Sequence, residues 1–319
     1  MPAIDFAAML AHERTKARAS THPKRQPPIQ KRETAAEQAA DAGGQAGPAV
    51  MVPVGVQESD PDLDLLWGGR AIPRLTDVSR EGVGRVRFCR DFLTAPEQAD
   101  VVHAISNCHA RSEWLQLPSR QLLNLGGVPH PSGMIAEELP GWLDTPLAGS
   151  GCVGVIPRLC AMDIFGDDTT PDQVLLNRYD CGQGIDPHSD GPLYQAVAAI
   201  ISLGTPAVLR FFDGVDKVTE LGSAVLPPGS LVVFDGPAYT SLAHGIKGTD
   251  VDVVGDSVLN ATEAGIEVGA KLLRGVRYSL TVRKVQRVAV EAGEYVSDED
   301  RREMAARRQW WTSAVSEKM

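Results

Sequence analysis

Short runs of apolar residues, separated by turns, dominate the middle of the chain. Most runs have the length of a strand rather than a helix, and glycine, proline or aspartate lies between them. We expect strands over residues 174–180, 196–203, 208–212, 231–234 and 276–285. This pattern predicts a mainly β protein with flanking helices, in which the strands form a barrel or a two-sheet sandwich.

The segment 275–285 alternates between apolar and polar residues, as a half-buried strand does. Its polar face carries Arg277, Ser279, Thr281 and Arg283. The two arginines lie about 20 Å apart along such a strand, and their planar side chains can hold the opposite ends of a short dicarboxylate. An exposed strand with its polar face in water has the same pattern.

His188-Ser-Asp190 places an imidazole and a carboxylate on one side of a predicted strand. Two histidines and one carboxylate on one face of an ion form the facial triad of non-haem Fe(II) oxygenases. Among the seven histidines, His244 comes in the right order to complete such a triad. The pair by itself is weak evidence, since Asp190 before Gly191 is also a typical turn residue.

A third polar pair, Asn177 and Tyr179, lies on the predicted strand that leads to His188. An amide and a phenol can each donate a hydrogen bond to a carboxylate or keto oxygen. Polar residues near a strand end also occur without any such role.

The order of these motifs resembles the AlkB family of Fe(II)/2-oxoglutarate-dependent dioxygenases. The resemblance covers residues 84–288. Within this range, several segments are similar to the branch of the sixth AlkB homologue: 114–117, Arg120, 124–134, 184–194, 201–204 and 236–239. It implies a double-stranded β-helix, or jelly roll, with an N-terminal substrate lid over residues 111–146. It also implies Fe(II), O2 and 2-oxoglutarate as cofactor and co-substrates, with release of succinate and CO2.

The resemblance assigns roles to individual residues. Those that match the iron ligands are His188, Asp190 and His244. Those that match the contacts to 2-oxoglutarate are Asn177, Tyr179, Arg277 and Arg283. Candidates for substrate contact are Trp114, Arg120, Asn124, His130 and Tyr194, although Trp114 is equally able to pack in a core and Arg120 to lie in solvent. The implied reaction is oxidative demethylation of a nucleic acid base, DNA or RNA, with loss of formaldehyde.

Composition divides the chain into three parts. Residues 1–81 are expected to form a largely disordered arm and linker, which offers a site for a protein partner. The catalytic domain is expected over 82–290, with a helix that begins at Thr94, where Glu97 can complete a capping box. An acidic surface insertion is expected over 247–274, and a C-terminal helical extension over 291–319.

Charge and cysteine content limit the partners. A net charge of −10 argues against broad electrostatic binding of nucleic acid, although a local basic strip is available in Lys271, Arg274, Lys284 and Arg287. Five cysteines without a Cys-x-x-Cys pair favour a reducing compartment, the cytoplasm or nucleus. We expect a monomer without a membrane partner. The alternative functions are oxidation of a protein or small molecule, and noncatalytic binding on a jelly-roll scaffold.

Overall fold

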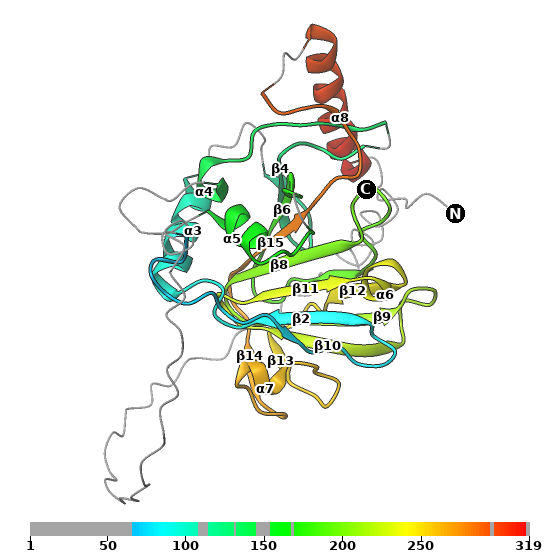
Figure 1. Ribbon diagram of the computed structural model, residues 1–319. Helices are drawn as coiled ribbons and strands as arrows, with labels where there is room; N and C mark the ends of the chain where they lie inside the picture. The colour runs from blue at the N-terminus through cyan, green and yellow to red at the C-terminus, as the bar shows by residue number, and fades with distance from the viewer. Residues whose placement is uncertain are drawn as a thin grey trace, which may run out of the picture.

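Two β-sheets packed face to face form the centre of the protein (Figure 1). The computed structural model describes residues 66–107, 114–130, 132–144, 154–166, 169–293 and 297–316, with side chains as far as residue 309. No helix within these ranges is long and apolar enough to cross a membrane.

The larger sheet has eight strands, each antiparallel to its neighbours. In spatial order they are β1 (Thr76–Asp77), β2 (Arg85–Cys89), β11 (Leu231–Asp235), β8 (Val197–Gly204), β15 (Arg277–Arg283), β6 (Gln173–Tyr179), β4 (Gln121–Leu125) and β3 (Leu115–Gln116). The smaller sheet contains β10 (Glu220–Leu226), β9 (Ala207–Asp213), β12 (Leu242–Ile246) and β7 (Ile185–His188). This arrangement is the predicted jelly roll, and all five predicted strands are present.

Alternation along the strands of the large sheet creates two apolar cores. In β8, Ala198 and Ile200 pack between the two sheets, whereas Val197, Ala199 and Ile201 pack on the opposite face. Both faces of the strand are therefore covered, which explains why its sequence is apolar apart from Ser202 and the terminal Gly204. We call the first cluster the inner core and the second the helix-side core.

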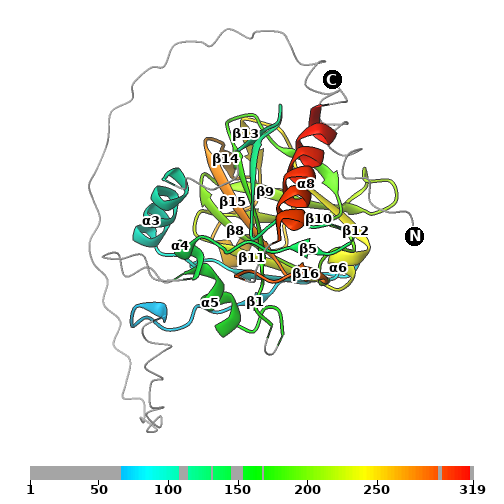
Figure 2. The same cartoon turned by 90° about the horizontal axis from the view of Figure 1, so that it is seen from above.

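Helices cover the outer face of the large sheet. The helices α3 (Ala95–Ser106), α4 (Gly141–Asp144) and α5 (Val155–Ala161) lie together on one side of the molecule (Figure 2). The capping box predicted at the start of α3 is confirmed, since Glu97 and Thr94 exchange both hydrogen bonds. Val101 and Ile105 on this helix contribute to the helix-side core.

Shorter elements complete the fold. The helix α6 (Pro237–Thr240) precedes β12, and α7 (Ala261–Ala264) lies beside the hairpin of β13 (Val251–Val253) and β14 (Lys271–Leu273) (Figure 1). The strand β16 (Val288–Val290) pairs in parallel with β5 (Met134–Ile135). The C-terminal segment contains α8 (Asp298–Ser316), whose Arg307 donates to the carbonyl of Gly133 over 2.7 Å.

The folded region begins earlier than residue 82. Trp67 is 1% exposed and packs edge-on against Phe92, with 5.9 Å between ring centroids. Thr76 pairs with Phe88 as part of the large sheet. The predicted linker therefore belongs to the domain from Trp67 onward, and residues 1–65 of the predicted arm lie outside the described residues.

The segment 247–274 is not a purely superficial insertion. Asp252 is fully buried, and its carboxylate accepts hydrogen bonds from Arg274 over 2.6 Å and from Arg210 over 3.3 Å. These bonds fix the β13–β14 hairpin to the smaller sheet, because Arg210 lies on β9. Arg274 is consequently occupied in this ion pair instead of belonging to an open basic strip.

Candidate active site

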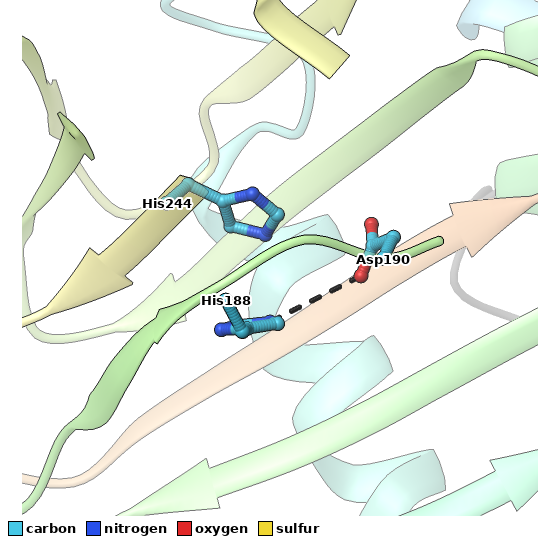
Figure 3. Close-up of side chains that lie close together, drawn as sticks. All are labelled: His188, Asp190 and His244. Atoms are coloured by element: carbon cyan, nitrogen blue, oxygen red, sulfur yellow. Dashed lines mark ion pairs between the residues drawn. The ribbon is translucent and has the colours of Figure 1, made fainter. Parts of the chain in front are cut away.

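Three potential metal ligands meet between the two sheets. His188 ends β7 and His244 lies in β12, where the two residues are direct cross-strand partners. Asp190 follows two residues after β7, and Gly191 then turns the chain with φ of +88°. The three side chains lie together in Figure 3, and their ligand atoms are all within 4.8 Å of one another. The predicted facial triad is thus assembled.

Both imidazoles are prepared for metal binding. The carbonyl of Asp186 lies 2.8 Å from Nδ1 of His188 and accepts its proton, which leaves the Nε2 lone pair directed toward Asp190. Burial, followed by the proximity of His188, lowers the pKa of His244 to about 3. His244 is therefore neutral at physiological pH, which is the form that ligates metals.

The carboxylate of Asp190 has two different oxygens. Oδ1 accepts a hydrogen bond from Nη1 of Arg283 over 3.0 Å. Oδ2 is buried without a hydrogen-bond partner among the described residues. Burial on its own raises the pKa of Asp190, but the positive charge of Arg283 holds this pKa below its usual range. The ionised carboxylate therefore offers one oxygen that a cation would satisfy.

At the other end of β15, Arg277 is buried with an incomplete set of partners. Its Nε donates to the hydroxyl of Ser202 over 2.9 Å, and its guanidinium lies 5.5 Å from the ring centroid of Tyr179. Nη1 and Nη2 are both buried and have no hydrogen-bond partner within the described part of the chain. A planar pair of unsatisfied donors matches the two oxygens of a carboxylate.

The neighbouring strand β6 adds the other two predicted contacts. Asn177 and Tyr179 are buried on the inner face, and Tyr179 is the cross-strand partner of Arg277. Nε of Arg120 donates to Oδ1 of Asn177 over 3.1 Å. Because that oxygen is used, the amide group of Asn177 keeps its NH2 for other acceptors. Arg120 is 1% exposed, so it lies inside the fold and not in solvent.

This donor set fits Fe(II) and 2-oxoglutarate. The unpartnered oxygen of Asp190 and the two imidazoles suit a divalent cation. The unpartnered edge of Arg277 suits a carboxylate that lies on the same inner face. Burial of these polar groups without partners costs free energy, and binding of the two groups would remove that cost.

The predicted substrate residues are dispersed. Tyr194 is buried, and its ring lies 4.1 Å from the guanidinium carbon of Arg283. Asn124 accepts a hydrogen bond from Gln173. Trp114 is partly buried and packs against the helix-side core, and contact of its ring with substrate stays a prediction. His130 lies in a turn with Ser132, whose hydroxyl contacts Arg307 of α8.

The expected lid is partly built into the large sheet. Strands β3 and β4 lie within residues 111–146 and extend that sheet beyond β6. Residues 111–113, 131 and 145–146 of the expected lid lie outside the described residues.

Two further residues of the site were not identified from the sequence. Gln173 is the cross-strand partner of Arg283 and accepts its Nε–H over 3.1 Å. Ser202 accepts the Nε–H of Arg277. The period of two offered a signal for Gln173, since it shares the face of Asn177 and Tyr179. Ser202 lies in a strand of otherwise apolar residues, so its polarity was the available signal.

A jelly roll with two histidines and one aspartate in a facial arrangement defines a non-haem iron oxygenase. Residues 142–283 match the model of the 2OG-Fe(II) oxygenase superfamily. The chain is 31% identical over 221 residues to the probable RNA/DNA demethylase ALKBH6 of Danio rerio, and the match covers 66% of this chain and 90% of that protein. An uncharacterised protein of Acanthamoeba polyphaga mimivirus is 30% identical over 37% of this chain and 50% of its own length.

Among solved structures, OsALKBH1 matches 62% of this chain and 97% of its own, with 18% identity and a TM-score of 0.38. The chain belongs to the AlkB family of Fe(II)/2-oxoglutarate-dependent oxygenases, and it is similar to ALKBH6. It is therefore a dioxygenase that uses Fe(II), 2-oxoglutarate and O2.

Proposed function

We propose that this dioxygenase removes alkyl groups from the bases of a nucleic acid, with the metal held by His188, Asp190 and His244. Fe(II) at this triad would supply oxidation of a substrate C–H bond, coupled to conversion of 2-oxoglutarate and O2 into succinate and CO2. An oxidised N-methyl group leaves as formaldehyde. The observation that carries the co-substrate part of this proposal is the pair of unpartnered Arg277 nitrogens on the inner face that also holds the triad.

Different residues of the chain bind 2-oxoglutarate and orient the metal ligand Asp190. Arg277 would pair with a carboxylate of 2-oxoglutarate, because its two Nη groups are buried and unsatisfied. Asn177 and Tyr179 donate neutral hydrogen bonds to the same molecule from β6. Arg283 holds Oδ1 of Asp190 and thereby keeps the carboxylate ionised and oriented.

The nucleic acid substrate is supported by the similarity to the Danio rerio protein, which spans most of that protein's length. Oxidation of a protein or small molecule is the second candidate. It is favoured by the net charge of −10 and by the pairing of two expected basic groups, Arg274 with Asp252 and Lys284 with Asp172. These pairs leave two of the four residues of the predicted basic strip, Lys271 and Arg287, for phosphate contacts.

Metal and co-substrate binding are tested first. Anaerobic titration of the full chain with Fe(II) and 2-oxoglutarate should give the visible charge-transfer absorption of the chelate. The band should disappear in His188→Ala, which loses a ligand, and persist in the matched variant His103→Ala on the exposed side of α3. A band of wild-type intensity in His188→Ala would overturn the assigned ligand set.

The substrate is tested by turnover. Succinate and formaldehyde would be measured with methylated single-stranded DNA, methylated single-stranded RNA and a methylated peptide, each beside its unmethylated form. Formaldehyde release from an oligonucleotide alone supports the proposal. Release from the peptide alone would replace it with the second candidate.

A further inference from the structure

The metal site is continued by a chain of hydrogen bonds that spans three neighbouring strands. We propose that Gln173 is a positioning residue, whose buried amide is oriented by Asn124 and holds Arg283 against the carboxylate of Asp190. The inference rests on the proposed role of Asp190 as a metal ligand. It assigns a function to Asn124 that differs from substrate contact.

The contacts form one continuous line. Nη1 of Arg283 donates to Oδ1 of Asp190 over 3.0 Å, and Nε of Arg283 donates to Oε1 of Gln173 over 3.1 Å. Nε2 of Gln173 then donates to Oδ1 of Asn124, again over 3.1 Å. Gln173 is fully buried and Arg283 is 1% exposed, so bulk water does not compete for the two bonds of Arg283.

Strand register places these groups side by side. Gln173 and Arg283 are direct partners in the β6–β15 pair. Asn124 on β4 is the partner of Leu175, two residues along β6 from Gln173 and on the same face. The line of hydrogen bonds therefore crosses the sheet from β4 to β15 and ends at Asp190.

The direction of each bond follows from its chemistry. A guanidinium has only donors, so Gln173 must turn its carbonyl oxygen toward Arg283. The NH2 group of Gln173 then faces β4, where it needs an acceptor, and the carbonyl of Asn124 supplies one. Without that acceptor, nothing in this line opposes a reversed amide, which would place two donors against each other at Arg283.

The orientation of Arg283 matters because it decides which oxygen of Asp190 is available. The bond to Gln173 fixes the plane of the guanidinium, which also packs against the ring of Tyr194. Nη1 then occupies Oδ1 and leaves Oδ2 buried without a partner among the described residues. A loosely held Arg283 would compete for both oxygens, so metal affinity should fall.

Metal binding to the full chain provides the test. Anaerobic titration with Co(II) alone, followed by d–d absorption, would be compared for wild type, Gln173→Met and Gln173→Glu. We expect Gln173→Met to weaken metal binding by about 10- to 100-fold, the usual effect of losing a residue that supports a ligand. Gln173→Glu should stay within about threefold of wild type, since it keeps the acceptor for Arg283 and Asn124 can rotate to donate to it.

Asn124 supplies a second, milder pair of variants. Asn124→Leu removes the acceptor for Gln173 and should weaken Co(II) binding by about 3- to 10-fold, whereas Asn124→Asp keeps the acceptor and should restore most of the affinity. Gln98→Met on α3 is the matched control, since it removes an amide far from the triad in the fold. The melting temperature of each metal-free variant separates a loss of folding from a loss of metal affinity.

The outcomes separate this inference from the proposed function. If wild type binds no Co(II), the proposed metal site is wrong. If wild type binds Co(II) and folded Gln173→Met binds it equally well, the positioning role is overturned while the metal site stands. If Gln173→Met does not fold, equal affinity in Asn124→Leu and Asn124→Asp overturns the proposal instead.

Discussion

Arg277 and Arg283 belong to the same alternating pattern and have opposite surroundings. Both lie on the inner face of β15, and each is 1% exposed. Arg283 has Asp190 and Gln173 as partners, and although burial alone would lower its pKa, Tyr194 and Asp190 raise it above the usual value. Arg277 has only Ser202 as a hydrogen-bond partner in the described chain, and burial lowers its pKa to about 10.

The difference is between a guanidinium that is already paired within the chain and one with two unsatisfied nitrogens, and the predicted contact of Arg283 with 2-oxoglutarate stays a prediction. A buried guanidinium that pairs with a carboxylate of its own chain contributes to the fold and, here, to the metal ligand. A buried guanidinium with two unsatisfied nitrogens destabilises the unliganded protein and gains its partner only when a ligand binds. The alternating sequence predicts that both arginines face inward, but it does not distinguish these two surroundings.

Removal of Arg283 should have the largest effect on stability. Arg283→Leu leaves the carboxylate of Asp190 buried without its cation, which we expect to lower the free energy of unfolding by about 3–5 kcal/mol. Urea denaturation of the metal-free protein at pH 7 measures this loss. The double variant Arg283→Leu with Asp190→Asn should recover much of it, because the unpaired charge is then absent. An additive double variant would argue against the pair.

Removal of Arg277 should affect binding instead of folding. Arg277→Leu should leave the free energy of unfolding unchanged or higher, since it removes an unsatisfied buried cation. Its affinity for 2-oxoglutarate should fall by about 100-fold or more, through loss of two charge-assisted hydrogen bonds. Titration of 2-oxoglutarate into the anaerobic Fe(II) protein measures the change.

The conservative variant sharpens this second test. Arg277→Lys keeps the positive charge but loses the planar fork, so its affinity should lie between those of wild type and Arg277→Leu. If Arg277→Leu is destabilised as strongly as Arg283→Leu and still binds 2-oxoglutarate normally, the two arginines have the same structural role.

The sequence predicted the parts of this site that depend on local spacing. The period of two placed Arg277 and Arg283 on one face, and the His188–Asp190 spacing together with chain order selected His244. These predictions hold in the structure because side chains alternate between the two faces of a strand, whichever strands it pairs with. The same reasoning predicted the capping box of α3, which is also a local pattern.

Features that depend on pairing between distant segments were not predictable in this way. Trp114 comes just before β3 and packs against residues of the helix-side core that are distant in the sequence. Arg274 is neutralised by Asp252, and Lys284 by Asp172 from more than a hundred positions away. Trp67 joins the domain through contact with Phe92, although the surrounding composition is typical of a linker.

Arg158 is a third buried arginine, and its ion pair lies away from the proposed ligand site. Breaking this pair should have the smallest effect on the free energy of unfolding, so it serves as a reference for the other two arginines. Its Nη2 donates to Oε1 of Glu97 over 2.5 Å on the helix side of the large sheet. Burial alone would raise the pKa of Glu97, but the hydrogen bonds from Arg158 and from the backbone of Thr94 hold this pKa below its ordinary value of 4.5. The pair should therefore stabilise the fold above pH 4.5 and lose that contribution as the pH falls through the lower, folded-state pKa.

Glu97→Gln tests this expectation. At pH 7 the variant should unfold with a free energy about 1–3 kcal/mol below that of wild type, because a charge-assisted hydrogen bond is lost. The gap should narrow from pH 4.5 downward, since the wild-type carboxylate becomes protonated and the amide of the variant does not titrate. Denaturation midpoints at pH 7, 5, 4 and 3 measure the gap, and a constant difference would contradict the assigned pKa. Binding of 2-oxoglutarate should be unchanged, which separates a paired arginine of the fold from the unsatisfied Arg277.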